Sequence, residues 1–204
     1  MTTEITSWTL AEFMEEGRFP PPEPIVEGLL HHGELMILSA TAKTGKSVLA
    51  ANLAMAVGYS LPFLDRFPTR SVNVLVLQTE ITNGAYSDRL KKMHLALPGE
   101  PVSTRIHIAS GRLRLDETQG PLVLQKKIKD LDIGCVILDP FYTMHEKDED
   151  KAKDIAPLLT VLKNLVLVTN VGCVLVHHQG KKGEGGNTRQ PGHQHRGSSA
   201  FADV

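Results

Sequence analysis

Three neighbouring residues in the stretch "SATAKTGKSVLAANLAMAV", residues 39–57, are suited to holding a phosphate. Gly45, Lys46 and Ser47 reproduce the end of the pattern G-x-x-x-x-G-K-[ST]. In that pattern backbone N–H groups wrap a phosphate, the lysine reaches the β and γ oxygens, and the hydroxyl binds Mg²⁺. Ala40 replaces the first glycine, which is tolerable if its φ stays negative. We therefore expect a nucleotide site formed by Ala42, Lys43, Thr44, Gly45, Lys46, Ser47 and Val48.

Two carboxylates follow apolar runs elsewhere in the chain. In "CVILDP" four apolar residues lead to Asp139, which predicts a carboxylate beside the phosphates that holds Mg²⁺ together with Ser47. In "VLVLQTE" Glu80 stands at the tip of a predicted strand, where a carboxylate can polarise the water that attacks a γ-phosphate. Either acid alone could merely cap a strand. Together with the loop they predict a site that binds and hydrolyses ATP with Mg²⁺.

Apolar strands must position these residues. The runs "ELMILS", "SVNVLVLQTE", "RIHIAS", "GCVILDP" and "GCVLVHH" predict strands, and the segments between them have helical spacing. Strands separated by helices indicate an α/β fold of the P-loop NTPase kind: a mostly parallel sheet flanked by helices on both faces, joined by right-handed crossovers. The carboxyl ends of such strands share one edge, where ligands bind. Every candidate residue above falls at such an end or directly after it.

The helices are predicted from their apolar spacing. The first follows the phosphate loop, and Gly58 is placed to stop it. Pro121 can open the third helix, which precedes "GCVILDP". The predicted apolar positions of the four helices are Leu49, Leu53 and Val57; Leu90, Met93 and Leu97; Leu124, Ile128 and Leu131; and Ile155, Leu158, Leu162 and Leu165.

Composition limits the class of protein. The 204 residues suit one domain, and a formal net charge of -1 argues against general charge-driven binding to nucleic acid or membranes. Cys135 and Cys173 lie inside apolar runs, so we expect buried thiols rather than a disulfide or a metal site. The polar, acidic start "MTTEITSWTLAEFMEE" is not that of a signal peptide, and no apolar tract is long enough to span a bilayer. These features predict a cytoplasmic protein.

The motifs in their order resemble a known family. The run "PEPIVEGLLHHGELMILSATAKTGKSVLAANLAMAVGYSLPFLDRFP", followed by "VNVLVLQTE", "VILDPFYTMHEKDED", "VLVHHQGKK" and "HRGSSAFAD", is similar to the RecA-like ATPases of the RepA type. These are plasmid and phage replicative helicases, related more distantly to DnaB. The resemblance spans about residue 20 to the end. It implies a RecA-like ATPase domain over residues 25–204 behind an N-terminal arm, residues 1–24, assembled as a hexameric ring with single-stranded DNA in its channel.

The resemblance also implies roles for individual residues. Lys46 and Ser47 match the family's phosphate lysine and Mg²⁺ hydroxyl, Glu80 its catalytic base, and Asp139 its Walker B acid. Lys43 matches a loop lysine that is frequent in these relatives. Either His178 or Gln179, in "HHQGK", is expected to sense the γ-phosphate, because a neutral donor on the adjacent strand end can move when that phosphate leaves.

The histidines of the C-terminal part could instead be structural or bind a metal. Without the resemblance, His177 and His178 would be one buried and one exposed strand-end histidine, and for His177 we favour that structural role. A zinc site of His177, His178, His193 and His195 is formally possible. The segment has no cysteine and no helical histidine spacing, which argues against it.

The segment "GKKGEGGNTRQPGHQHRG", residues 180–197, is a candidate DNA-binding loop. It carries Lys181, Lys182, Arg189 and Arg196 against the single acid Glu184, a local charge of +3. The resemblance places it at the channel loop that touches single-stranded DNA. Because it lacks aromatic residues that would stack on bases, we expect binding that is salt-sensitive and nearly sequence-blind. The alternative is a solvated basic loop with no partner.

Two functional classes fit the sequence. One is a DNA-stimulated ATPase motor of the replicative helicase type. The other is a nucleotide-dependent binding or regulatory ATPase, such as a recombination or replication mediator, that unwinds no strand. The chain stops at "FADV", where relatives continue with further strands, so we expect an incomplete C-terminal edge of the sheet. Arg189 and Arg196 would be weak substitutes for an arginine supplied by a neighbouring subunit.

Overall fold

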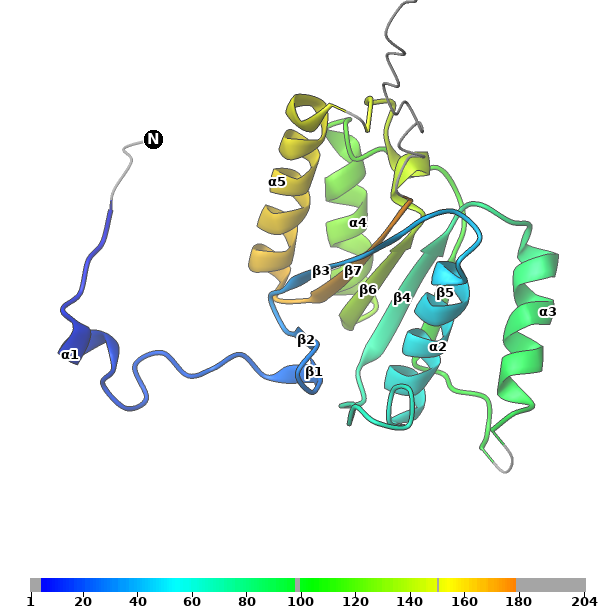
Figure 1. Cartoon of the computed structure of the whole chain (residues 1–204), viewed down its shortest axis with the longest axis horizontal. Coiled ribbons are helices and arrows are strands. Elements are labelled where there is room, and N and C mark those ends of the chain that lie inside the picture. Colours follow the sequence, from blue (N-terminus) through cyan, green and yellow to red (C-terminus); the bar gives the residue numbers. More distant parts are fainter. Residues whose placement is uncertain (1–4, 98–99, 150, 179–204) are drawn as a thin grey trace, which may run out of the picture.

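The computed structural model describes residues 5–97, 100–149 and 151–178, and strands alternate with helices along most of this length (Figure 1). The strands are β1 (Pro24–Val26), β2 (Leu30–His31), β3 (Leu35–Ala40), β4 (Asn73–Gln78), β5 (Ile106–Ala109), β6 (Ile133–Asp139) and β7 (Gly172–His178). The helices are α1 (Leu10–Phe13), α2 (Lys46–Tyr59), α3 (Asn83–His94), α4 (Gln119–Asp130), η1 (Phe141–Met144, a 3₁₀ helix) and α5 (Ala152–Thr169).

Five strands form one sheet in the order β3-β7-β6-β4-β5, and every pairing within it is parallel. The carboxyl ends of the strands therefore share one edge, as the alternation of elements predicted. The fold is that of a RecA-like P-loop NTPase, with helices on both faces of the sheet. β1 and β2 form a separate antiparallel pair, which the sequence analysis did not predict.

The sheet separates two apolar cores. Along β6, Cys135 and Ile137 pack in the core that contains α2, whereas Val136 and Leu138 pack in the core that contains α4 and α5. Successive side chains of a strand point to opposite faces, so a strand covered on both faces must be apolar at nearly every position. This explains the unbroken run "CVIL" that leads to Asp139.

Helix α2 is the most deeply embedded element beside the sheet. Nine of its residues are buried, and four of them are alanines, which allow close packing on β4, β6 and β7. The prediction that Gly58 stops this helix is wrong, because Gly58 is buried within it and Ser60, with φ 60°, ends it. A Cβ at Gly58 would lie 2.3 Å from Ile106 Cγ1. Gly58 therefore serves the close approach of α2 to β5.

The other helices follow the predicted spacing with shifted ends. Leu158, Leu162 and Leu165 are buried in α5, as predicted. Leu97 lies beyond the end of α3, and Leu131 is the C-terminal cap of α4 rather than a residue inside it. Helix α4 begins at Gln119, two residues before Pro121, which is compatible with a proline in the first turn.

Two expectations from composition can be compared with the structure. Both cysteines are free and buried, and burial raises the pKa of the Cys135 thiol to about 12. None of the helices in the described ranges combines the length and the apolar character that crossing a membrane requires.

Candidate functional site

The loop between β3 and α2 has the backbone that phosphate binding requires. Ala40 is the last residue of β3 and hence extended, so its methyl group causes no strain at the position of the missing glycine. Lys43 and Gly45 have positive φ values of 64° and 87°. A Cβ on Gly45 would meet no atom within 4 Å, so open space lies beside the loop. The loop geometry thus fits a phosphate group.

Polar contacts within the loop hold it in a folded form. The Thr44 hydroxyl donates to the Thr41 carbonyl at 2.9 Å, and the Val48 N–H donates to the Gly45 carbonyl at 3.0 Å as α2 begins. Ala42, Lys43 and the Val48 side chain are exposed. The loop is consequently ordered by its own bonds, with its outer side chains directed to solvent.

Lys46 is buried with its charged end inside the loop. It is 5 % exposed, and its Nζ donates to the Ala40 carbonyl at 2.9 Å and to the Thr41 carbonyl at 2.6 Å. A buried ammonium requires such acceptors. Phosphate oxygens are stronger acceptors than carbonyls, so the lysine is positioned to exchange these carbonyls for a phosphate.

Ser47 and Asp139 lie together at the start of α2 and the end of β6. The Ser47 hydroxyl donates to Asp139 Oδ1 at 3.1 Å, and Asp139 is 2 % exposed. Burial raises the pKa of Asp139, as does the charge of Glu80, while the Ser47 hydrogen bond opposes the shift. A hydroxyl and a buried carboxylate supply the oxygen ligands that Mg²⁺ prefers, and an added cation would relieve the burial cost. The pair thus fits a Mg²⁺ site.

Glu80 lies in a bend directly after β4. The register pairs Gln78 of β4 with Asp139 of β6, which brings the segment after β4 alongside the Mg²⁺ pair. Glu80 is close enough to contribute to the raised pKa of Asp139. A solvent-accessible carboxylate at this edge can reach a water molecule on a bound phosphate chain.

Gln78 holds the bend that carries Glu80, and the sequence analysis did not identify it. Its amide is 4 % exposed. In the orientation that satisfies its hydrogen bonds, the amide oxygen accepts from the Glu80 N–H at 2.9 Å and the Ile81 N–H at 2.6 Å, and the nitrogen donates to the Ile81 carbonyl at 3.0 Å. A glutamine at the end of an apolar strand was the available signal, because a buried amide must find partners.

A second connection joins the same bend to the loop after β6. The Thr79 N–H donates to the Asp139 carbonyl at 3.1 Å, and the Thr79 and Thr143 hydroxyls are 2.5 Å apart. The Thr143 hydroxyl is also 2.8 Å from the Pro140 carbonyl, to which it donates. The segments carrying Glu80 and Asp139 are therefore fixed to each other by the backbone and by side chains.

The two histidines at the end of β7 are both partly exposed, so the expectation of one buried and one exposed histidine is wrong. His178 pairs with Ala40 across the sheet, and its Nε2 is buried without a hydrogen-bond partner among the described residues. His177 Nδ1 instead lies 3.7 Å from Glu149 Oε1. His178 Nε2 is thus a buried ring nitrogen without a described partner, on the strand that pairs with the end of β3, where the phosphate loop begins.

Three further side chains surround this edge, and sequence reasoning missed all of them. The Arg89 guanidinium lies 6.0 Å from the centre of the Tyr86 ring, and its charge tends to lower the pKa of Asp139. Burial, assisted by the charge of Asp139, raises the pKa of Tyr86 to about 12. The Tyr142 ring is edge-on to His178 at 5.6 Å. The sequence prediction for α3 considered only its apolar spacing, and it therefore gave no role to Arg89 or Tyr86.

Several predicted residues lie outside the described part of the chain. These are the alternative sensor Gln179, the basic residues of the candidate DNA-binding loop, and two histidines of the zinc alternative: Lys181, Lys182, Arg189, Arg196, His193 and His195. Across residues 5–97, 100–149 and 151–178, no group of three or more histidine, cysteine or acidic side chains could hold a metal ion.

The sheet order, the loop geometry around Lys46 and the meeting of Ser47 and Asp139 define a P-loop nucleotide-binding domain. Comparison with protein families agrees with this assignment, since the model of the AAA domain family matches residues 2–184. The chain belongs to this family, and its domain is therefore a nucleotide-binding ATPase domain. A search of curated proteins found no match.

Proposed function

We propose that this chain is the ATP-hydrolysing RecA-like domain of a RepA-type replicative helicase that acts on single-stranded DNA. The observation that carries the ATPase part is the meeting of Ser47 and Asp139 at 3.1 Å, next to Lys46 in the chain and near enough to Glu80 for its charge to act on Asp139. The proposed DNA part rests on the basic segment at residues 180–197 and its family resemblance.

In this proposal each side chain has a separate task. Lys46 leaves the carbonyls of Ala40 and Thr41 and binds the β and γ oxygens. Ser47 and Asp139 would hold Mg²⁺, which when bound supplies positive charge that offsets the charge of the phosphates. Lys43, at the exposed tip of the loop, adds a further positive charge toward the phosphate chain.

Glu80 accepts a proton from the attacking water as the water oxygen bonds to the γ-phosphorus. The bond between that phosphorus and the β–γ bridging oxygen breaks, which releases ADP and phosphate. Gln78 fixes the backbone of Glu80 and thereby the direction of the base. Nε2 of His178, which has no partner among the described residues, or Gln179, the next residue in the sequence, contacts the γ-phosphate and responds to its departure.

The proposed DNA contact is electrostatic. Lys181, Lys182, Arg189 and Arg196 follow β7 directly in the sequence, so a change at His178 has a short covalent path to them. A hexameric ring would bring six such segments around one strand of DNA. Each lysine that contacts a phosphate should contribute about 0.7 to the salt slope of single-strand binding.

The decisive experiment is steady-state ATP hydrolysis with and without single-stranded DNA, at low and high salt. Stimulation that fades with salt is expected, and the double variant Lys181→Ala/Lys182→Ala should lower the salt slope of DNA binding. The matched control is Lys127→Ala/Lys129→Ala, which removes two exposed lysines of α4. Hydrolysis without stimulation would instead favour a regulatory ATPase, and an unchanged slope would remove Lys181 and Lys182 from the contact.

A further inference from the structure

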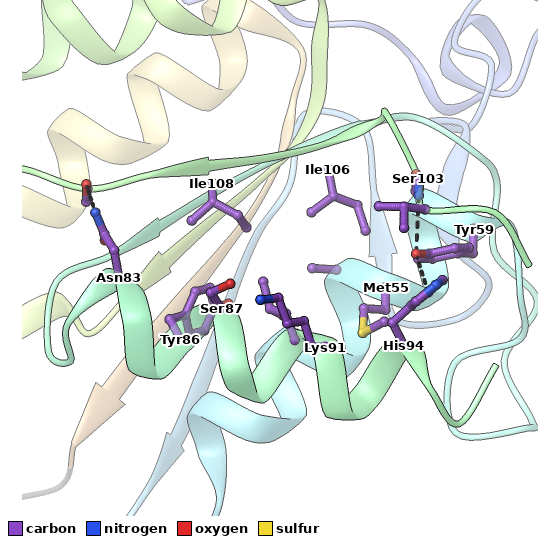
Figure 2. Close-up of a pocket in the computed structure, with 14 residues that line it drawn as sticks. Met55, Tyr59, Asn83, Tyr86, Ser87, Lys91, His94, Ser103, Ile106 and Ile108 are labelled. Atoms are coloured by element: carbon purple, nitrogen blue, oxygen red, sulfur yellow. Dashed lines mark hydrogen bonds between the residues drawn. The ribbon is translucent and has the colours of Figure 1, made fainter.

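A pocket of about 480 Å³ lies between α2, α3 and the edge strand β5, away from the phosphate loop (Figure 2). Its wall is largely apolar; Tyr59 and His94 stand at one end of it, and Lys91 lies between His94 and Ser87 along α3. Pockets of this size and character accept side chains or small molecules. The apolar residues that line it are Ala54, Met55, Leu90, Val102, Ile106 and Ile108. We name this pocket the β5 groove.

Polar contacts at both ends of α3 flank the groove. At the start of the helix, Asn83 Nδ2 donates to the Ser110 hydroxyl at 3.1 Å. At its end, the Tyr59 hydroxyl lies 2.9 Å from His94 Nδ1 and accepts from the Ser103 N–H at 3.2 Å. Between these contacts only Tyr86 of α3 is buried. The groove is thus an ordered feature with fixed ends, rather than a packing defect.

Residues 5–23 of the N-terminal arm carry an apolar surface without a partner elsewhere in the described chain. Each of these residues is exposed. Trp8, Phe13 and Phe19 contact one another, with ring centres 5.2 Å apart for Trp8 and Phe19 and 4.8 Å for Phe13 and Phe19. They remain 42 %, 53 % and 45 % exposed. Clustered exposed aromatic rings are typical of interaction surfaces.

The arm and the β5 groove lie at opposite sides of the molecule. In Figure 1 the arm leaves the β1–β2 pair on the side of β3, whereas α3 stands beyond β5 at the other end of the sheet. A contact between these two surfaces in different copies is head-to-tail, because it joins unlike patches. Such a contact closes into a ring or extends into a filament.

The charges of the two surfaces are opposite. The arm carries one base, Arg18, against four acids, and its charge over residues 5–23 is -3; the acids are Glu12, Glu15, Glu16 and Glu23. Helix α3 carries three bases and the single acid Asp88, a charge of +2; the bases are Arg89, Lys91 and Lys92. Complementary charges favour the encounter and fix the orientation of two protein surfaces.

We propose that the N-terminal arm of one copy docks in the β5 groove of a second copy of this chain. The aromatic rings of the arm fill the apolar wall, and its acidic residues face the basic side of α3. The phosphoryl chemistry at the carboxyl ends of the strands is not involved, so this proposal does not depend on ATP hydrolysis.

Trp8 provides the measurement, because it is the one tryptophan in the sequence. Its emission maximum should shift to shorter wavelength as protein concentration rises, together with an increase in mass above 22.3 kDa measured by light scattering. Trp8→Ala should weaken the association measured by light scattering by about thirtyfold, as for a central aromatic residue of an interface. An emission maximum that never shifts would overturn the proposal. A maximum that is blue-shifted at every concentration while the mass stays at 22.3 kDa would also overturn it, because it would place the arm on its own copy.

A mixing experiment shows which surfaces meet. The arm variant Trp8→Ala/Phe13→Ala has an intact groove and no tryptophan. The groove variant Lys91→Glu/Ile108→Glu keeps Trp8, and both of its changes are at exposed side chains, which favours correct folding. Neither variant alone should self-associate, whereas mixing them should shift the emission of Trp8. No shift on mixing would contradict the pairing, and Val123→Glu, at an exposed site on α4, is the matched control for the added acid.

Discussion

Helices α2 and α3 pack in the same apolar core on one face of the sheet, yet they are held there very differently. Helix α2 buries nine residues, including Lys46, whereas α3 buries only Tyr86 and is fixed by polar contacts at its two ends. Buried apolar area is the main source of local stability. The residues proposed to bind the phosphates therefore stand at the start of the more deeply buried helix, and the segment with Glu80 leads into the helix that buries only Tyr86.

The comparison indicates a division between binding and chemistry. A phosphate grip benefits from preorganisation, because groups that are already in place cost no ordering on binding. Glu80, the proposed catalytic base, depends instead on the bend that Gln78 holds just before α3. Mutations on the α2 side should therefore change nucleotide affinity, and mutations on the α3 side should change turnover.

Lys46→Ala should have the largest effect. It removes a buried charge that is poised to pair with the β and γ phosphates, so we expect loss of ATP binding across the range in which the unchanged protein saturates. A titration of a fluorescent ATP analogue measures this. Lys127→Ala, at an exposed position on α4, removes a positive charge outside the site, so it is the control and should retain binding. Unchanged affinity for Lys46→Ala would remove the loop from the nucleotide site.

Glu80→Gln should separate chemistry from binding. The amide cannot accept the proton of the attacking water, so kcat should fall by about 10²–10⁴, with ATP affinity preserved. Steady-state hydrolysis and the same titration measure the two quantities. Glu100→Gln, at an exposed position between α3 and β5, controls for loss of one carboxylate. Near-normal turnover in Glu80→Gln would mean that the base lies elsewhere.

Gln78→Leu should show a smaller effect in the same direction. The leucine fills similar space but releases the backbone of residues 80 and 81, so Glu80 loses its fixed direction. We expect kcat to fall by about tenfold with little change in ATP affinity. A tenfold fall in rate corresponds to ~1.4 kcal/mol, which is about the cost of one lost positioning contact. Gln78→Glu is a useful second variant, since it keeps the acceptor and loses the donor. A change confined to affinity would contradict a positioning role.

Gly58→Ala should test how closely α2 is held against the sheet. The new methyl would lie 2.3 Å from Ile106 Cγ1. Overpacking of this kind costs about 1–3 kcal/mol, which exceeds the gain of ~1 kcal/mol from replacing glycine in a helix. Denaturant unfolding should therefore show a net loss. Adding Ile106→Ala should recover part of that loss, and strictly additive effects in the double variant would argue against the contact.

Tyr59→Phe should produce the smallest effect, confined to α3. It removes the hydroxyl that contacts His94 and Ser103 while keeping the ring. Loss of one such contact is worth ~1 kcal/mol, so the amides of α3 should exchange with deuterium about fivefold faster. The amides in the middle of α2 serve as the internal control. Equal acceleration in both helices would remove the contrast between them.

The sequence predicted the parallel sheet well, because each central strand is covered on both faces and so reads as a continuous apolar run. It also placed Lys46, Ser47, Asp139, Glu80 and His178 at strand ends or just beyond them, where the structure brings them to one edge. Their chemical roles stay predictions.

Other features depend on partners that are distant in the sequence. The backbone contacts of Gln78 and the approach of Arg89 to Tyr86 arise only when strands and helices assemble. Gly58 looked like a helix stop, but Ile106, from a strand 48 residues later, accounts for its presence. The β1–β2 pair has strands of only three and two residues, too short for a detectable alternation.

The resting position of Lys46 has a practical consequence for work with the purified protein. Because its ammonium group is already bonded to the carbonyls of Ala40 and Thr41, the loop has an internal substitute for its ligand. In the proposed site, nucleotide binding must break these two bonds before Lys46 can bind phosphate oxygens. The protein should consequently keep its fold during storage without nucleotide. Its measured nucleotide affinity will be a net value, reduced by the free energy needed to break the two bonds of Lys46.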